Sequence, residues 1–251
     1  MSKLKGEVSS YLEDRFAKPG IILANDSTST TDFTLSAPSG NQLSVNYVGM
    51  PGNRPSTYGN YIVIFKNQST IPYNDPNPET FELVTGDSSQ GTQVVPLTLA
   101  INTSYIVGYA VGSKLSSGSQ QEWGNIVSTG FIPASSPSDP STYTYFQPAL
   151  TQVTPQANSV TMNYSLPTGC TPKSNGAWVA IWQSGSPSYT LPPMGAAQIA
   201  LDSASGSAAI NGVDIVIGQT YTVGLFMSGW QAAQGGANIQ TSLACSSTFS
   251  T

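Results

Sequence analysis

Residues 97–111, LTLAINTSYIVGYAV, decide the fold, because their pattern of apolar residues recurs at residues 213–227, VDIVIGQTYTVGLFM. With a shift of 116 residues, each apolar anchor of the first stretch falls on an apolar residue of the second, and Tyr105 falls on Tyr221. A motif that recurs at one spacing indicates an internal duplication. We therefore expect two structural units of the same design.

The duplication extends to the strands that precede these stretches, with a shift of 117 residues. Residues 43–47 match residues 160–164, and both alternate apolar and polar side chains as half-buried strands do. Residues 59–65 match residues 176–182, and both are apolar on two faces, as is typical of a central strand. Each half thus supplies roughly seven short strands in about 100 residues, which predicts an all-β protein of two tandem antiparallel β-sandwiches.

Residues 97–111 resemble the E–F region of fibronectin type III and related immunoglobulin-like domains. The similarity lies in the apolar alternation, the Asn-Thr pair before Tyr105 and the Tyr-x-Val-x-Tyr ending. The resemblance implies that Tyr105 and Tyr221 form tyrosine corners, in which the phenol bonds to the backbone upstream. Tyr109 and Leu225 stand where immunoglobulins place a cysteine, so their disulfide is missing. The resemblance implies no activity, because such sandwiches serve many functions.

These patterns divide the chain into four segments. Residues 1–29 form an N-terminal helical segment and connector, residues 30–133 the first sandwich and residues 147–251 the second. Between the sandwiches, residues 134–146 are rich in serine and proline, which predicts a linker that is not compact.

A short helix is expected at residues 7–17, because its apolar residues recur at helical spacing and Pro19-Gly20 ends it. Three turns of helix are marginally stable alone. The segment therefore either packs against its own sandwich or serves in assembly, where it would join copies of the chain into a homo-oligomer.

The charge distribution excludes several partners. Only 8% of the residues are charged, the net charge is −5, and Lys3, Lys5, Arg15 and Lys18 are half of the eight basic residues. Nucleic-acid binding needs a basic stripe that this chain lacks. The apolar runs are too short to span a bilayer, so membrane insertion is not expected. No N-terminal signal peptide is visible. We expect a soluble protein whose composition suits an extracellular or virion surface.

Catalytic chemistry has little support in the sequence. The chain contains no histidine, which removes imidazole-dependent triads and most zinc sites. A carboxylate pair for glycoside hydrolysis needs two well-placed acids, and the second half has no acidic residue at the positions aligned with Asp75, Glu79, Glu82 and Glu122. No glycine-rich phosphate loop leads from a strand into a helix. We predict a protein that is not an enzyme and needs no cofactor or metal.

Two loop tryptophans are the candidate ligand-binding residues. Trp123 lies in residues 120–125, QQEWGN, and Trp230 in residues 228–231, SGWQ, each before the last strand of its half. A flat indole beside amides suits stacking on a sugar ring. The alternative is that each indole folds back and caps its own sandwich.

Four polar or aromatic neighbours complete the predicted site. Glu122 and Asn125 flank the first tryptophan, and Gln231 follows the second. Tyr58 lies in the loop before the third strand, at the same end of an immunoglobulin-like sandwich. By contrast, Trp178-Val-Ala-Ile-Trp182 places both of its tryptophans on one face of a strand, which favours core packing.

Cys170 and Cys245 both lie in the second half. They form either one disulfide that closes a long loop, worth about 4 kcal/mol in the chain-entropy model, or two buried thiols.

The leading hypothesis is a non-enzymatic recognition module, lectin-like or cell-surface binding, with a carbohydrate or cell-surface ligand at the loop aromatics. The alternative is a structural or assembly protein, such as a phage or virion component, or a secreted toxin or effector subunit. Low charge and a detachable N-terminal segment fit that alternative as well.

Overall fold

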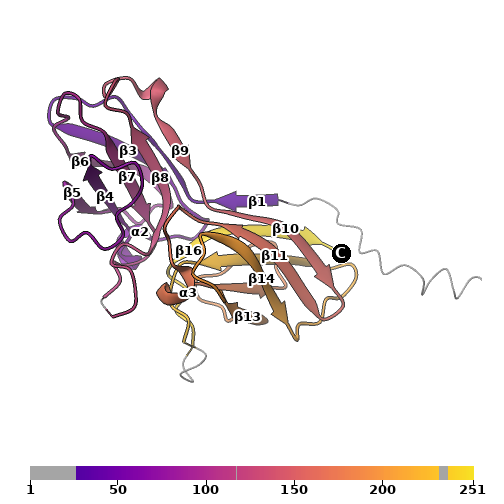
Figure 1. The fold of residues 1–251 in the computed structure, drawn as a ribbon. Coiled ribbons are helices and arrows are strands. Elements are labelled where there is room, and N and C mark those ends of the chain that lie inside the picture. Colours follow the sequence, from indigo (N-terminus) through magenta and orange to yellow (C-terminus); the bar gives the residue numbers. More distant parts are fainter. Residues whose placement is uncertain (1–26, 117, 232–236) are drawn as a thin grey trace, which may run out of the picture.

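The computed structural model describes residues 27–116, 118–231 and 237–251 (Figure 1). The helix predicted at residues 7–17 lies outside the described residues. Within them the chain is almost entirely β-structure, and its pairings are antiparallel.

The first half of the chain folds into a sandwich of two sheets (Figure 1). The smaller sheet has the order β2-β3-β6 and the larger one β5-β4-β7-β8-β9. In chain order the strands are β2 (Asp32–Leu35), β3 (Gln42–Val48), β4 (Tyr61–Lys66), β5 (Thr80–Leu83), β6 (Gln90–Pro96), β7 (Tyr105–Ala110), β8 (Ile126–Ile132) and β9 (Thr144–Phe146). A one-turn helix, α2 (Pro55–Tyr58), precedes β4.

The second half repeats this design. Its smaller sheet has the order β10-β11-β14 and its larger sheet β1-β16-β15-β12-β13. The strands are β10 (Ala149–Gln156), β11 (Ser159–Ser165), β12 (Trp178–Trp182), β13 (Gly195–Gln198), β14 (Ser205–Asn211), β15 (Thr220–Phe226), β16 (Leu243–Ser250) and the early strand β1 (Ser27–Thr30). Helix α3 (Pro172–Asn175) is the counterpart of α2.

Each half therefore has a three-stranded sheet facing a five-stranded one, a β-sandwich architecture like that of fibronectin type III domains. The predicted fold class, tandem immunoglobulin-like sandwiches, is confirmed. Strand β6 ends at Pro96. Proline cannot continue a ladder of hydrogen bonds, and Asn102 then turns the chain in the left-handed region at φ 57°.

Both tyrosine corners are present. The hydroxyl of Tyr105 accepts a hydrogen bond of 2.9 Å from the backbone N–H of Ala100, and that of Tyr221 accepts one of 2.8 Å from Val216. Both tyrosine side chains are fully buried. The corner thus satisfies a backbone donor in the turn before the central strand, in both halves alike.

The central strands are buried on both faces, as predicted. In β12, Val179 and Ile181 belong to the main core, whereas Trp178, Ala180 and Trp182 form the outer face of the sheet. Trp178 stacks on Phe226 with ring centroids 4.2 Å apart. The predicted core role of Trp178 and Trp182 is confirmed.

The segment between the sandwiches is folded, which corrects the prediction of a loose linker. Residues 140–142 form a 3₁₀ turn whose N-cap is Asp139, and β9 follows it directly and pairs with β8. Tyr143 is buried, and its hydroxyl donates to the carbonyl of Pro137. Proline restricts the backbone here without keeping the segment away from the sandwich.

Replacing either corner tyrosine by phenylalanine, Tyr105→Phe or Tyr221→Phe, removes the acceptor and leaves a backbone N–H unpaired. We expect each variant to lose about 1–3 kcal/mol of unfolding free energy. Urea denaturation checks this, with Tyr58→Phe, at a partly buried tyrosine that forms no corner, as the control variant. An unchanged midpoint for both corner variants would contradict the role assigned to the hydroxyls.

Candidate functional site

The two sandwiches meet through a buried amide cluster at their loop ends. The Gln121 side chain donates to the carbonyl of Gly169 at 2.8 Å and accepts from the backbone N–H of Thr171 at 2.8 Å. Asn175 in turn accepts from the backbone N–H of Gln121 at 2.8 Å. Gln121 and Asn175 are both buried and mutually bonded, so they fix one sandwich against the other.

A pair of equivalent tyrosines reinforces this contact from both sides. A Cβ built on Gly169 would lie 3.5 Å from the Tyr73 ring, and one built on Gly52 would lie 3.6 Å from the Tyr189 ring. The two contacts are repeat-equivalents, so each half places a tyrosine on a glycine turn of the other. Tyr189 also stacks on Tyr58, with ring centroids 5.1 Å apart. Tyr58 is therefore held in the contact between the sandwiches and does not join Trp123.

The loops before β8 and β16 enclose a groove between the sandwiches. Its volume is about 480 Å³. The first sandwich contributes polar residues that include Gln120 and Asn125, and the second contributes Trp230 and Gln231. Three of the residues predicted from the sequence, Asn125, Trp230 and Gln231, thus line one groove.

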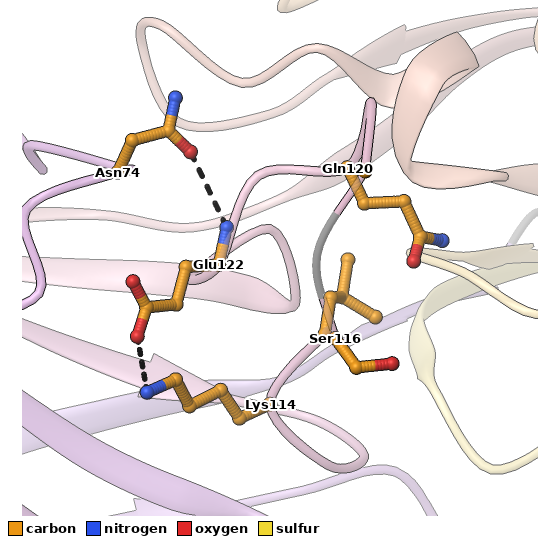
Figure 2. Close-up of a pocket in the computed structure, with 7 residues that line it drawn as sticks. Asn74, Lys114, Ser116, Gln120 and Glu122 are labelled. Carbon is orange, nitrogen blue, oxygen red and sulfur yellow. Dashed lines mark hydrogen bonds and ion pairs between the residues drawn. The ribbon is translucent and has the colours of Figure 1, made fainter.

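A second recess of about 650 Å³ shares residues 114–116 with the groove as lining residues. Figure 2 shows the Lys114 ammonium paired with the Glu122 carboxylate, and the Asn74 amide oxygen accepting from the backbone N–H of Glu122 at 3.4 Å. Lys114 also lies 4.4 Å from the centroid of the Trp123 ring. Glu122 is therefore committed to neutralising Lys114.

Trp123 is a packing residue. Its side chain is 1% exposed, and its indole N–H donates to the carbonyl of Asp75 at 2.8 Å. The ring lies edge-on to Tyr61 and Phe65 on the outer face of the larger sheet. An indole so enclosed offers no face to a sugar, so the structure favours the alternative in which Trp123 caps its own sandwich.

Trp230 occupies the equivalent loop but is only partly buried. Its backbone N–H donates to the carbonyl of Gly176 at 3.1 Å, and its ring lies 6.3 Å from that of Trp178. Its neighbour Gln231 is also partly exposed and donates its backbone N–H to Asn238. Trp230 thus combines a fixed backbone with a side chain that lines the groove.

Asn125 supplies an unpaired acceptor in the groove. Its Nδ2 donates to the carbonyl of Ser113 at 2.6 Å, which fixes the side chain. Its Oδ1 has no hydrogen-bond partner among the described residues, although the residue is 2% exposed. A buried acceptor without a hydrogen-bond partner lowers the stability of the folded protein, because its desolvation is not compensated. Asn125 thus lines the groove with one side of its amide bonded and one buried acceptor unpaired.

The cysteines are free thiols in the structure, so the disulfide alternative is not the one observed. Both are buried. Burial raises the pKa of the Cys170 thiol to about 12 and also raises the pKa of Cys245. Asn175 of the amide cluster donates to Cys170 Sγ at 3.7 Å. The thiols therefore serve packing.

No family model matches the chain, and no characterised protein matches it at a significant level. Among solved structures, the chain is similar to a "Biofilm associated protein - BSP domain" at 14% identity and a TM-score of 0.22, covering 79% of this chain and 26% of that one. It is also similar to the chicken CNTN1 FN1–FN3 domains at 12% identity and a TM-score of 0.23, covering 78% of this chain and 57% of that one. The chain thus spans only part of both structures.

No helix among the described residues has the length and hydropathy to cross a membrane. In the same residues, no three side chains of His, Cys, Asp or Glu gather closely enough to hold a metal ion.

The amide cluster has no signature in the sequence. Gln121 stands there only as a neighbour of Trp123, and Asn175 belongs to no motif. No local pattern marks them, because their partners lie about 50 residues away in the other sandwich.

Both thiols should resist alkylation in the native protein. A raised pKa leaves almost no thiolate at pH 8, and burial excludes the reagent. We expect iodoacetamide without reductant to add no label to the folded chain and two labels after denaturation, as read by intact mass. A denatured chain that takes up no label would reveal a disulfide instead.

Proposed function

We propose that this protein is a non-enzymatic recognition module that binds a neutral, hydroxyl-rich ligand, of the carbohydrate class, in the groove between the two sandwiches. Trp230 provides a ring face for stacking. The Oδ1 of Asn125 accepts a ligand hydroxyl, and the amides of Gln120 and Gln231 add donors and acceptors. The observation that carries the proposal is the unpaired acceptor of Asn125 in the same groove as the partly exposed Trp230.

The charges around the groove favour a neutral ligand. Lys114 lines both recesses, and the Glu122 carboxylate neutralises it. An anionic ligand would have to compete with that carboxylate, and the chain as a whole carries a net charge of −5. Ring stacking and hydroxyl bonding, by contrast, need no net charge.

The position of the groove between two joined sandwiches makes it a rigid binding surface for a ligand. Its two walls come from different sandwiches, and the cluster of Gln121 and Asn175 holds those sandwiches together directly beside it. A preorganised groove loses less conformational entropy on binding than loops that must order around the ligand.

A structural role is the second candidate function. The folded linker and the buried amide cluster favour it, because they make the two sandwiches a stiff spacer. Such a spacer would present other segments at a fixed separation, and it would need no ligand in the groove.

Binding to an array of neutral glycans, followed by calorimetric titration of the best glycan, tests the proposal. We expect Trp230→Ala to weaken binding by roughly fivefold or more, because loss of one stacking face is worth about 1 kcal/mol or more. Asn125→Leu should weaken it as well, by removal of the acceptor. Salt up to about 0.5 M should change the affinity little, since no charge pair is involved.

The matched control is Ile217→Ala, which removes an 84% exposed apolar side chain from a turn of the same sandwich. It should bind as the wild type does. The proposal fails if no neutral glycan binds, or if Trp230→Ala binds like the control.

A further inference from the structure

The groove between the sandwiches adjoins the second recess. Both are lined by Lys114, Leu115, Ser116 and Gln120. The groove has a volume of about 480 Å³ and the recess one of about 650 Å³, and each lies within the roughly 300–1,000 Å³ of a small-molecule site. A ligand that fills the groove therefore reaches the edge of a further hollow of comparable size.

The recess is lined mainly by polar side chains. Figure 2 shows Asn74, Glu122 and Lys114 on one side of it, with Ser116 and Gln120 across from them. The Lys114 and Glu122 side chains remain partly exposed, at 40% and 27% of their surface. Both charged groups are therefore within reach of a ligand while they stay paired with each other.

These side chains keep hydrogen-bonding capacity that the described part of the protein does not use. An ammonium has three donors and a carboxylate about four acceptor sites, and the pairing of Lys114 with Glu122 uses one of each. The Asn74 amide accepts through Oδ1 from the backbone N–H of Glu122, and its Nδ2 donates to no described residue. Gln120 donates through Nε2 to the carbonyl of Asn175 at 3.1 Å, and its Oε1 accepts from no described residue. The recess thus offers donors and acceptors together, and each hydroxyl of a sugar is itself both.

The recess differs from the groove in its aromatic lining. Trp230 lines the groove, whereas the described residues that line the recess include no aromatic side chain. Trp123 lies close by, but its side chain is 1% exposed and the Lys114 ammonium is 4.4 Å from its ring centroid. The groove therefore supplies a stacking face and the recess supplies hydrogen bonds only. Such a recess suits a further part of a ligand that is already held at Trp230.

We propose that the ligand is a chain of neutral sugar units, in which one unit stacks on Trp230 in the groove and the next bonds to the Lys114–Glu122 pair in the recess. This inference rests on the binding function proposed above and specifies the ligand as an oligosaccharide. The chain passes along residues 114–116, which line both hollows. Two joined units bind more tightly than one, because the second meets its site at the high effective concentration that the linkage sets.

The paired charges of the recess favour a neutral second unit. Lys114 and Glu122 carry opposite charges, so the pair has no net charge to attract an ionised sugar. An acidic unit would lie against the Glu122 carboxylate, whereas a hydroxyl can donate to that carboxylate and accept from the ammonium.

A length series of one glycan tests the proposal. The neutral glycan selected on the array is titrated by calorimetry into the full chain as its methyl monoglycoside, disaccharide, trisaccharide and tetrasaccharide. We expect the affinity to rise by roughly tenfold or more between the single unit and the tetrasaccharide, because hydrogen bonds to the charged pair are added.

Variants of the recess separate its contribution from that of the groove. Asn74 and Glu122 line the recess but not the groove. We expect Asn74→Ala and Glu122→Gln each to weaken tetrasaccharide binding by roughly threefold or more and to leave the binding of the single unit unchanged. Trp230→Ala should weaken both. The matched control is Glu79→Gln, which makes the same charge change at an exposed residue that lines neither hollow.

Equal affinity at every glycan length would overturn this inference and leave the binding function proposed above in place. So would tetrasaccharide binding that neither recess variant changes. Tighter binding of a glycan with an acidic second unit, strengthened further by Glu122→Gln, would assign the recess to an anionic sugar and overturn the neutral chain. The absence of binding by every glycan would overturn the proposed function itself, and this inference with it.

Discussion

The crossing of backbone strands between the two sandwiches is the constraint on which the rest of the structure depends. Thr31 alone separates β1, in a sheet of the second sandwich, from β2, in a sheet of the first. This residue is fully buried, and its carbonyl accepts a 2.6 Å hydrogen bond from Ser128 of the first sandwich while its N–H donates to Ala244 of the second. β9 makes the reciprocal crossing, so each repeat completes a sheet of the other and neither can rotate freely.

The fixed arrangement brings distant loops together. The loops before β8 and β16 belong to different repeats, yet Asn125 and Trp230 line one groove. Gln121 and Asn175 occupy the contact beside it with their side-chain bonds satisfied within the protein. The two tryptophans then differ: Trp123 packs on Tyr61 and Phe65, whereas Trp230 is only partly buried. Duplicated loops have thus become one packing element and one candidate binding element.

The sequence predicted most of what depends on local patterns. Alternation of side chains placed the strands of both sandwiches, and the repeated tyrosine predicted the two corners that Tyr105 and Tyr221 form. Prediction from the sequence failed where contacts between distant residues determine the structure. Strand β1 is held by backbone pairing with β16, and its polar residues show no apolar alternation that would predict a strand. The proline-rich segment before β9 likewise contains no pattern that predicts the burial of Tyr143. The exposure of a loop tryptophan depends likewise on what packs around it, which separated Trp123 from Trp230.

The central claim is that the reciprocal strand crossing and the amide cluster join the two sandwiches into one cooperative unit. Differential scanning calorimetry of the full chain tests this most directly, because independent domains unfold in separate transitions. The account predicts a single transition whose calorimetric enthalpy equals its van't Hoff enthalpy. Two resolved transitions, or a calorimetric enthalpy about twice the van't Hoff value, would show that each sandwich unfolds on its own and would contradict it.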